Sequence, residues 1–129
     1  MTLIDSSVWI AFWRGSDADI SRKVRELIKA DRACITGIIL TELLQGAKTT
    51  GEMDYLKGIL SDIPRLPLTE EVFVKAAEMS FQLKKLGKTV HTTDVIIAAS
   101  ALIHRAEMFT LDEHFKHLKL VVPLKLTTP

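Results

Sequence analysis

Short strand-like segments alternate with longer segments whose apolar residues recur at helical spacing. Strand patterns lie at residues 2–5, 33–36 and 107–111, with a last short one at 120–122 and an edge strand, at best, at the proline-flanked residues 65–68. The predicted helices run from Ser6 or Ser7 up to Gly15 and over residues 17–30, 37–47, 52–60, 69–86, 93–105 and 113–117. This alternation favours an α/β fold in which helices cover both faces of a parallel sheet.

Length and composition indicate one domain over residues 1–129. The chain has 129 residues, of which 47% are hydrophobic and 26% charged, as in ordinary globular proteins. The formal net charge of +1 excludes a uniformly basic protein. A nucleic-acid partner would therefore have to bind a local patch rather than the overall charge.

Cysteine content and hydropathy favour the cytoplasm. The single cysteine, Cys34, lies in an apolar stretch and suits a reducing compartment. No signal-peptide pattern is visible at the start of the sequence. The longest nearly apolar run, residues 95–103, is far shorter than the roughly 20 residues that span a bilayer. We therefore expect a cytoplasmic protein without a membrane segment.

Four carboxylates stand near the ends of predicted strands. Asp5 ends the first strand, Asp112 follows the strand at 107–111, Asp94 lies in the first turn of an apolar helix, and Glu42 lies in the helix after the second strand. Functional sites of open α/β sheets form beyond the carboxyl ends of the strands. The four acidic side chains are thus expected to converge on one cleft.

Each carboxylate taken alone has an ordinary explanation. Asp5 and Asp94 could cap helices, Asp112 could start a turn, and Glu42 could be a solvated helix residue. Taken together they favour a site, because Glu42 and Asp94 lie within apolar runs where a charge needs a partner. Clustered oxygen ligands without matching Cys or His suit Mg²⁺ or Mn²⁺, which can activate water and stabilise charge on a phosphodiester.

Four short segments carry a resemblance to a known family. They are residues 3–9 (LIDSSVW), 41–46 (TELLQG), 93–99 (TDVIIAA) and 110–115 (TLDEHF). In order and spacing they resemble the four motifs of PIN domains, particularly those of the small VapC-type toxins of toxin–antitoxin pairs. The resemblance covers essentially the whole chain.

The resemblance implies a PIN-like three-layer α/β/α sandwich with a central, mainly parallel sheet. It also implies an endoribonuclease toxin that depends on Mg²⁺ or Mn²⁺, forms a homodimer and binds a small antitoxin. By the same resemblance Asp5, Glu42, Asp94 and Asp112 are the catalytic, metal-holding residues. The neighbouring hydroxyls expected to support these carboxylates are Ser6, Thr93 and Thr110.

Basic and aromatic residues add weaker signals. Lys84, Lys85 and Lys88 lead without an intervening acid towards His91 and the acidic site, and could guide RNA phosphates or simply be a solvated helix end. Apolar helix surface is expected to receive the antitoxin; its aromatic members are Trp9, Phe12, Trp13, Phe73 and Phe81.

Two other functions remain open from the sequence. A phospho-accepting signalling domain has a similar length and an acidic Mg²⁺ site, but it usually carries adjacent acids after its first strand, where this chain has Ser6 and Ser7. A non-catalytic RNA-binding PIN module is the other alternative, which the intact acidic set disfavours. Metal-dependent RNA cleavage separates the three.

Overall fold

The computed structural model describes residues 1–128, which contain seven helices and a three-stranded sheet. The elements in chain order are β1 Thr2–Ile4, α1 Ser6–Arg14, α2 Ala18–Lys29, β2 Ala33–Cys34, α3 Gly37–Gln45, α4 Thr50–Leu60, α5 Glu70–Lys85, α6 Thr92–Ile103, β3 Glu107–Phe109 and α7 Phe115–Leu118. The predicted alternation of strands and helices is confirmed.

The sheet is parallel throughout, in the order β2-β1-β3. Leu3 pairs with Cys34 on one side and with Met108 on the other, and all three are fully buried. Buried apolar residues on consecutive positions are typical of a parallel sheet covered on both faces. All strands end at the same edge, so the residues after β1 and β3 become neighbours.

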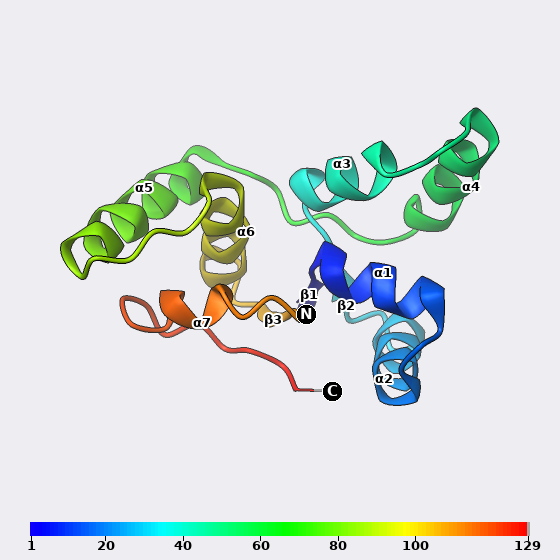
Figure 1. The fold of residues 1–129 in the computed structure, drawn as a ribbon, viewed down its shortest axis with the longest axis horizontal. Coiled ribbons are helices and arrows are strands. Elements are labelled where there is room, and N and C mark those ends of the chain that lie inside the picture. The colour runs from blue at the N-terminus through cyan, green and yellow to red at the C-terminus, as the bar shows by residue number, and fades with distance from the viewer. Residues whose placement is uncertain (129) are drawn as a thin grey trace.

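Helices lie on both sides of this sheet. Figure 1 shows the strands in the middle of the molecule, with α5 and α6 to the left and α1 and α2 to the right. The α3–α4 pair occupies the upper right of the same view. This arrangement confirms the expected α/β class with helices around a parallel sheet.

Capping residues explain where several helices begin and end. The side chains of Asp17, Thr36, Thr49 and Thr69 accept hydrogen bonds from backbone N–H groups in the first turns of α2, α3, α4 and α5. Gly15 ends α1 with a φ of 65°, which glycine adopts without strain. Asp5 occupies the N-cap position of α1, but its side chain makes no capping hydrogen bond.

The core is built around β1 and α6. Trp9 is fully buried, and its indole N–H donates to the carbonyl oxygen of Ile4 at 3.1 Å. Trp9 is therefore a core residue and is not available to a partner, unlike the partly buried Phe12 and Trp13 of the same aromatic set. Cys34 is buried as expected, and burial raises the pKa of its thiol to about 11, which leaves it unreactive at neutral pH.

Two local predictions were wrong, the strand at 120–122 and the serine cap of α1, and the edge strand is minimal. Residues 120–122 form no strand: the chain turns there with hydrogen bonds from Leu120 and Val121 back into α7, and Leu126 bridges to β3 instead. The edge strand at 65–68 is reduced to one bridge between Arg65 and Ile35, because Pro64 and Pro67 lack the N–H groups of a ladder. Neither Ser6 nor Ser7 is the N-cap of α1.

No helix within residues 1–128 combines the length and the apolar character needed to cross a membrane.

Candidate active site

Asp5 leaves the carboxyl end of the central strand and is almost completely buried, with 4% of its surface exposed. Its Oδ2 atom accepts hydrogen bonds from the hydroxyls of Ser7, at 2.8 Å, and Thr110, at 2.9 Å. Ser7 also accepts from the backbone N–H of Leu111 at 3.1 Å. These contacts join the ends of β1 and β3 and hold the Asp5 carboxylate in place, which rules out simple capping as its role.

Glu42 reaches the same region from α3. Its Oε1 atom accepts a hydrogen bond from the Ser6 hydroxyl at 3.4 Å, which links α3 to the start of α1. Burial raises the pKa of Glu42 above the ordinary value, and the charges of Asp5 and Asp94 raise it further, while the Ser6 hydrogen bond opposes the shift. Glu42 is thus electrostatically coupled to two other acidic residues.

Asp94 is the third acidic member and lies in the first turn of α6. Its pKa is also raised, first by burial and then by the charges of Asp112 and Asp5. The nearby His91 and His114 partly offset this shift. Asp94 therefore connects Asp112 to the rest of the acidic group.

Asp112 follows β3 and is held by His114. Its Oδ1 atom accepts from the backbone N–H of His114 at 2.9 Å and lies 3.1 Å from the ring Nδ1 of the same residue. The Asp112 backbone N–H donates to the Thr110 hydroxyl at 3.0 Å. Thr110 consequently contacts both Asp5 and Asp112.

The charges of Asp5, Glu42, Asp94 and Asp112 influence one another, so the four carboxylates predicted from the sequence lie in one region of the structure. Ser6 and Thr110 contact members of this group as expected, and His91 lies near Asp94. Within residues 1–128, no hydrogen bond or ion pair joins Thr93 or the three lysines at the end of α5 to the carboxylates. The Lys85 ammonium lies 4.5 Å from the centre of the Phe81 ring instead.

Sequence reasoning missed two residues of this site, Ser7 and His114. Each follows an acidic residue by two positions and contacts its carboxylate. That spacing is the signal that could have found them, because an aspartate side chain commonly accepts a hydrogen bond from the residue two positions on, as in an Asx turn.

The four carboxylates do not by themselves form a coordination site for a metal ion. Among residues 1–128, no group of three or more Asp, Glu, His or Cys side chains is placed so that it could hold a metal ion. The donors are nonetheless chemically uniform, since all four are carboxylates. The raised pKa values of Glu42 and Asp94 indicate negative charge that the surrounding histidines only partly compensate. Such a group suits a hydrated divalent cation that reaches some carboxylates through water.

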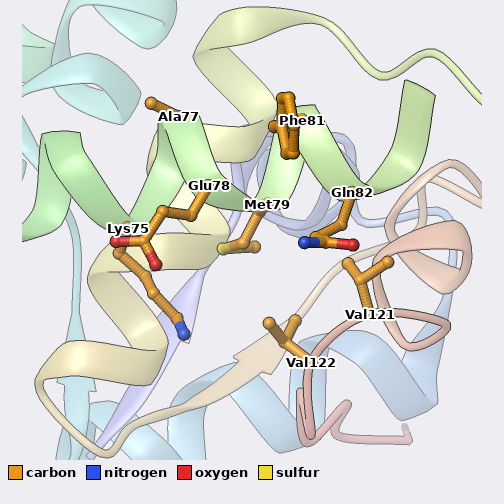
Figure 2. A pocket seen from close by; sticks show the side chains of 8 residues that line it. All are labelled: Lys75, Ala77, Glu78, Met79, Phe81, Gln82, Val121 and Val122. Atoms are coloured by element: carbon orange, nitrogen blue, oxygen red, sulfur yellow. The ribbon is translucent and has the colours of Figure 1, made fainter. Parts of the chain in front are cut away.

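Another hollow lies away from this group, between α5 and the segment after α7. Figure 2 shows the side chains of Met79, Val121 and Val122 at this pocket, with the Phe81 ring pointing away from the two valines. None of the residues predicted for the site lines it. The acidic edge of the sheet is therefore the stronger candidate for chemistry.

The fold and the site together define a class: small α/β proteins with a carboxylate group beyond the carboxyl ends of a parallel sheet. The family model described as "PIN domain" matches residues 2–120 of this chain. The chain belongs to the PIN-domain family.

Curated relatives resemble the chain over nearly its whole length. Ribonuclease VapC11 of Mycobacterium tuberculosis is 27% identical, over 97% of this chain and 96% of the relative. Ribonuclease VapC1 of Rickettsia felis is 31% identical, over 91% of this chain and 90% of the relative.

Solved structures share the fold. VapBC-1 from nontypeable Haemophilus influenzae matches with a TM-score of 0.82 and 20% identity, over 98% of this chain and 96% of that one. VapBC2 from Rickettsia felis, bound to a DNA fragment from its promoter, matches with a TM-score of 0.81 and 19% identity, over the same shares of the two chains.

Proposed function

We propose that this chain is a metal-dependent endoribonuclease and the toxin of a type II toxin–antitoxin pair. The observation that carries the proposal is the electrostatic coupling of four carboxylates from four separate segments at one edge of the sheet. The ribonuclease names of its full-length relatives support the same activity. The whole chain acts as one PIN domain in this proposal.

The acidic group would hold Mg²⁺ or Mn²⁺ through Asp5, Glu42, Asp94 and Asp112, directly or through water. When bound, the ion would supply positive charge to the phosphodiester and make a water molecule more acidic. The protein's own contribution is to hold the carboxylates before the ion arrives. Ser7 and Thr110 fix Asp5, Ser6 contacts Glu42, and His114 holds Asp112.

The substrate in this proposal is RNA that is single-stranded or looped, cut by in-line attack of water on a phosphodiester. The products would carry 5′-phosphate and 3′-hydroxyl ends. His91 would approach the substrate beside Asp94, and Lys84, Lys85 and Lys88 would attract the RNA backbone from the end of α5.

A small antitoxin and a second copy of the chain are the proposed protein partners, in the cytoplasm. Several relatives of known structure are toxin–antitoxin complexes, such as the one from Klebsiella pneumoniae. Large apolar side chains remain exposed on α5, where Phe73 is 46% and Phe81 58% exposed. Such a surface suits burial against another protein.

The test is to incubate the purified chain with labelled RNA and to identify the ends of the products. Growth of cells that express the chain, with and without the neighbouring reading frame, tests the toxin role. We expect 5′-phosphate ends and growth arrest that the neighbouring protein relieves. Phosphorylation of an aspartate by a small phosphodonor, without RNA cleavage, would instead identify a signalling domain.

A further inference from the structure

A pocket of about 500 Å³ opens beside the acidic group, between α1, α3 and α4. These helices lie on the right-hand side of Figure 1. Its lining residues include Trp13, Arg14, Glu42, Leu43, Tyr55 and Leu56. Glu42 therefore belongs both to this pocket and to the carboxylate group, so that whatever occupies the pocket lies next to the proposed reaction centre.

The pocket has the walls of an aromatic stacking site. The Trp13 ring packs against the buried Trp9, with ring centroids 5.8 Å apart, so that its position is fixed. The Tyr55 ring is 68% exposed and lines the same space from α4. Leu43 and Leu56 are buried and supply apolar lining. Exposed aromatic rings of this kind bind bases of single-stranded nucleic acids by stacking.

The charged residues that line the pocket indicate where a base and where a phosphate of the RNA would lie. Glu42 and Glu52 line the pocket and would repel a phosphate placed inside it. The Glu52 carboxylate, which the acidic group does not use, can instead accept hydrogen bonds from N–H groups of a base. Arg14, the last residue of α1, lines the same pocket and takes part in none of the ion pairs found within residues 1–128. Its guanidinium is free to pair with a backbone phosphate next to that base.

We propose that this pocket binds one unpaired base of the RNA, stacked on Tyr55, next to the phosphodiester that the acidic group would cleave. The inference rests on the proposed ribonuclease function and deepens it. It would account for the single-stranded substrate proposed above, because a base within a duplex cannot enter. It also makes α4 a determinant of which nucleotide flanks the cut.

The test uses Tyr55→Ala, Tyr55→Phe and the control Leu120→Ala, which removes a large apolar side chain that is 59% exposed, against 68% for Tyr55, and does not line the pocket. Binding of a short single-stranded RNA is measured in EDTA by fluorescence anisotropy, and kcat and KM for its cleavage are measured with Mn²⁺. Loss of one stacked base costs about 1–3 kcal/mol, or roughly 5- to 150-fold in affinity. We expect Tyr55→Ala to raise the Kd and KM by at least about fivefold, and Tyr55→Phe and Leu120→Ala to behave as wild type.

An RNA with an abasic nucleotide beside the cut gives a second readout. We expect it to bind wild type and Tyr55→Ala equally weakly. If Tyr55→Ala has the Kd and KM of the wild type, the pocket assignment is overturned. The ribonuclease proposal still stands in that case, provided that the wild type cleaves RNA. Tyr55→Ala could instead bind RNA like the wild type but resist inhibition by the protein encoded in the neighbouring reading frame. That result would assign the pocket to a peptide of the partner protein and overturn the base-binding proposal. Absence of cleavage by the wild type would refute the ribonuclease proposal itself.

Discussion

His114 contacts the Asp112 carboxylate at two points, through its backbone N–H at 2.9 Å and its ring Nδ1 at 3.1 Å. Both contacts are made to the same oxygen, Oδ1. With Oδ1 engaged in this way, Oδ2 is the oxygen left for a cation or a water molecule. The ring contact requires the tautomer that carries the proton on Nδ1, or the protonated ring. Asp112 is thus an oriented carboxylate rather than a loose loop residue.

Removing the His114 ring should weaken metal binding. Loss of a partner that orients a ligand costs about 10- to 100-fold in metal affinity, and the exposure of this ring places the effect near the lower value. We expect His114→Ala to need about tenfold more Mn²⁺ for half-maximal thermal stabilisation. His114→Asn, whose amide N–H can replace Nδ1–H, should recover most of the loss, and His114→Gln should not. Equal Mn²⁺ requirements in all four proteins would remove the positioning role.

Thr110 should contribute to the stability of the folded chain because it contacts both Asp5 and Asp112. Thr110→Val deletes a donor to a nearly buried carboxylate and an acceptor for the Asp112 N–H. The expected loss is roughly 1 to 2 kcal/mol in the free energy of unfolding. Thr41→Val is the matched control, since its hydroxyl donates only to the Gly37 carbonyl within the exposed face of α3. Urea denaturation of the three proteins measures the difference, and equal midpoints for both variants would show that the Thr110 bridge is not stabilising.

Asp94→Asn should be neutral or stabilising without metal. The change removes one of the like charges that raise the pKa of Glu42, while Asn keeps nearly the same shape. Millimolar Mn²⁺ should raise the melting temperature of the wild type, because a ligand of the folded state stabilises it by mass action, and should raise that of the variant less. Melting curves in EDTA and in Mn²⁺ decide. Asp94 would instead be a structural residue if the variant melted several degrees lower than the wild type in EDTA and Mn²⁺ did not change the melting temperature of the wild type.

Acid should stabilise the metal-free protein in one pH window. Burial and like charges raise the pKa values of Glu42 and Asp94 in the folded state. Between the ordinary carboxyl value of about 4 and these raised values, the folded state binds more protons than the unfolded state. The free energy of unfolding from these groups therefore rises as the pH falls into that window. Unfolding in EDTA across the pH range should show a flatter dependence for the Glu42→Gln/Asp94→Asn double variant, and parallel profiles would contradict the shifts.

The order of elements and the acidic residues could be predicted from the sequence because both depend on local patterns. Helical spacing of apolar residues gave α2 and α5 almost to the residue, with Thr69 as the cap and Gly87 just beyond the end. Aspartates directly after strands indicated the functional edge because parallel strands end together.

The remaining errors depend on tertiary contacts. Val121 and Val122 have strand-forming side chains, but the turn after α7 takes their backbone away from the sheet and Leu126 bridges to Met108 instead. The sequence does not say which of Trp9, Phe12 and Trp13 is core, and only the fold shows that the Trp9 indole bonds to the end of β1. The hydrogen bond from the Leu111 N–H to the Ser7 hydroxyl joins residues 104 positions apart, so no local pattern specifies it.

Cleavage of a 5′-labelled single-stranded RNA by wild type and Asp94→Asn, each with Mn²⁺ and with excess EDTA, tests the acidic site most directly. The proposed function predicts cleavage by the wild type in Mn²⁺, none in EDTA, and a rate at least about a hundredfold lower for the variant, as expected when a ligand of a catalytic ion is lost. Cleavage that persists in EDTA, or that Asp94→Asn performs at the wild-type rate, would contradict a metal-dependent reaction at these carboxylates.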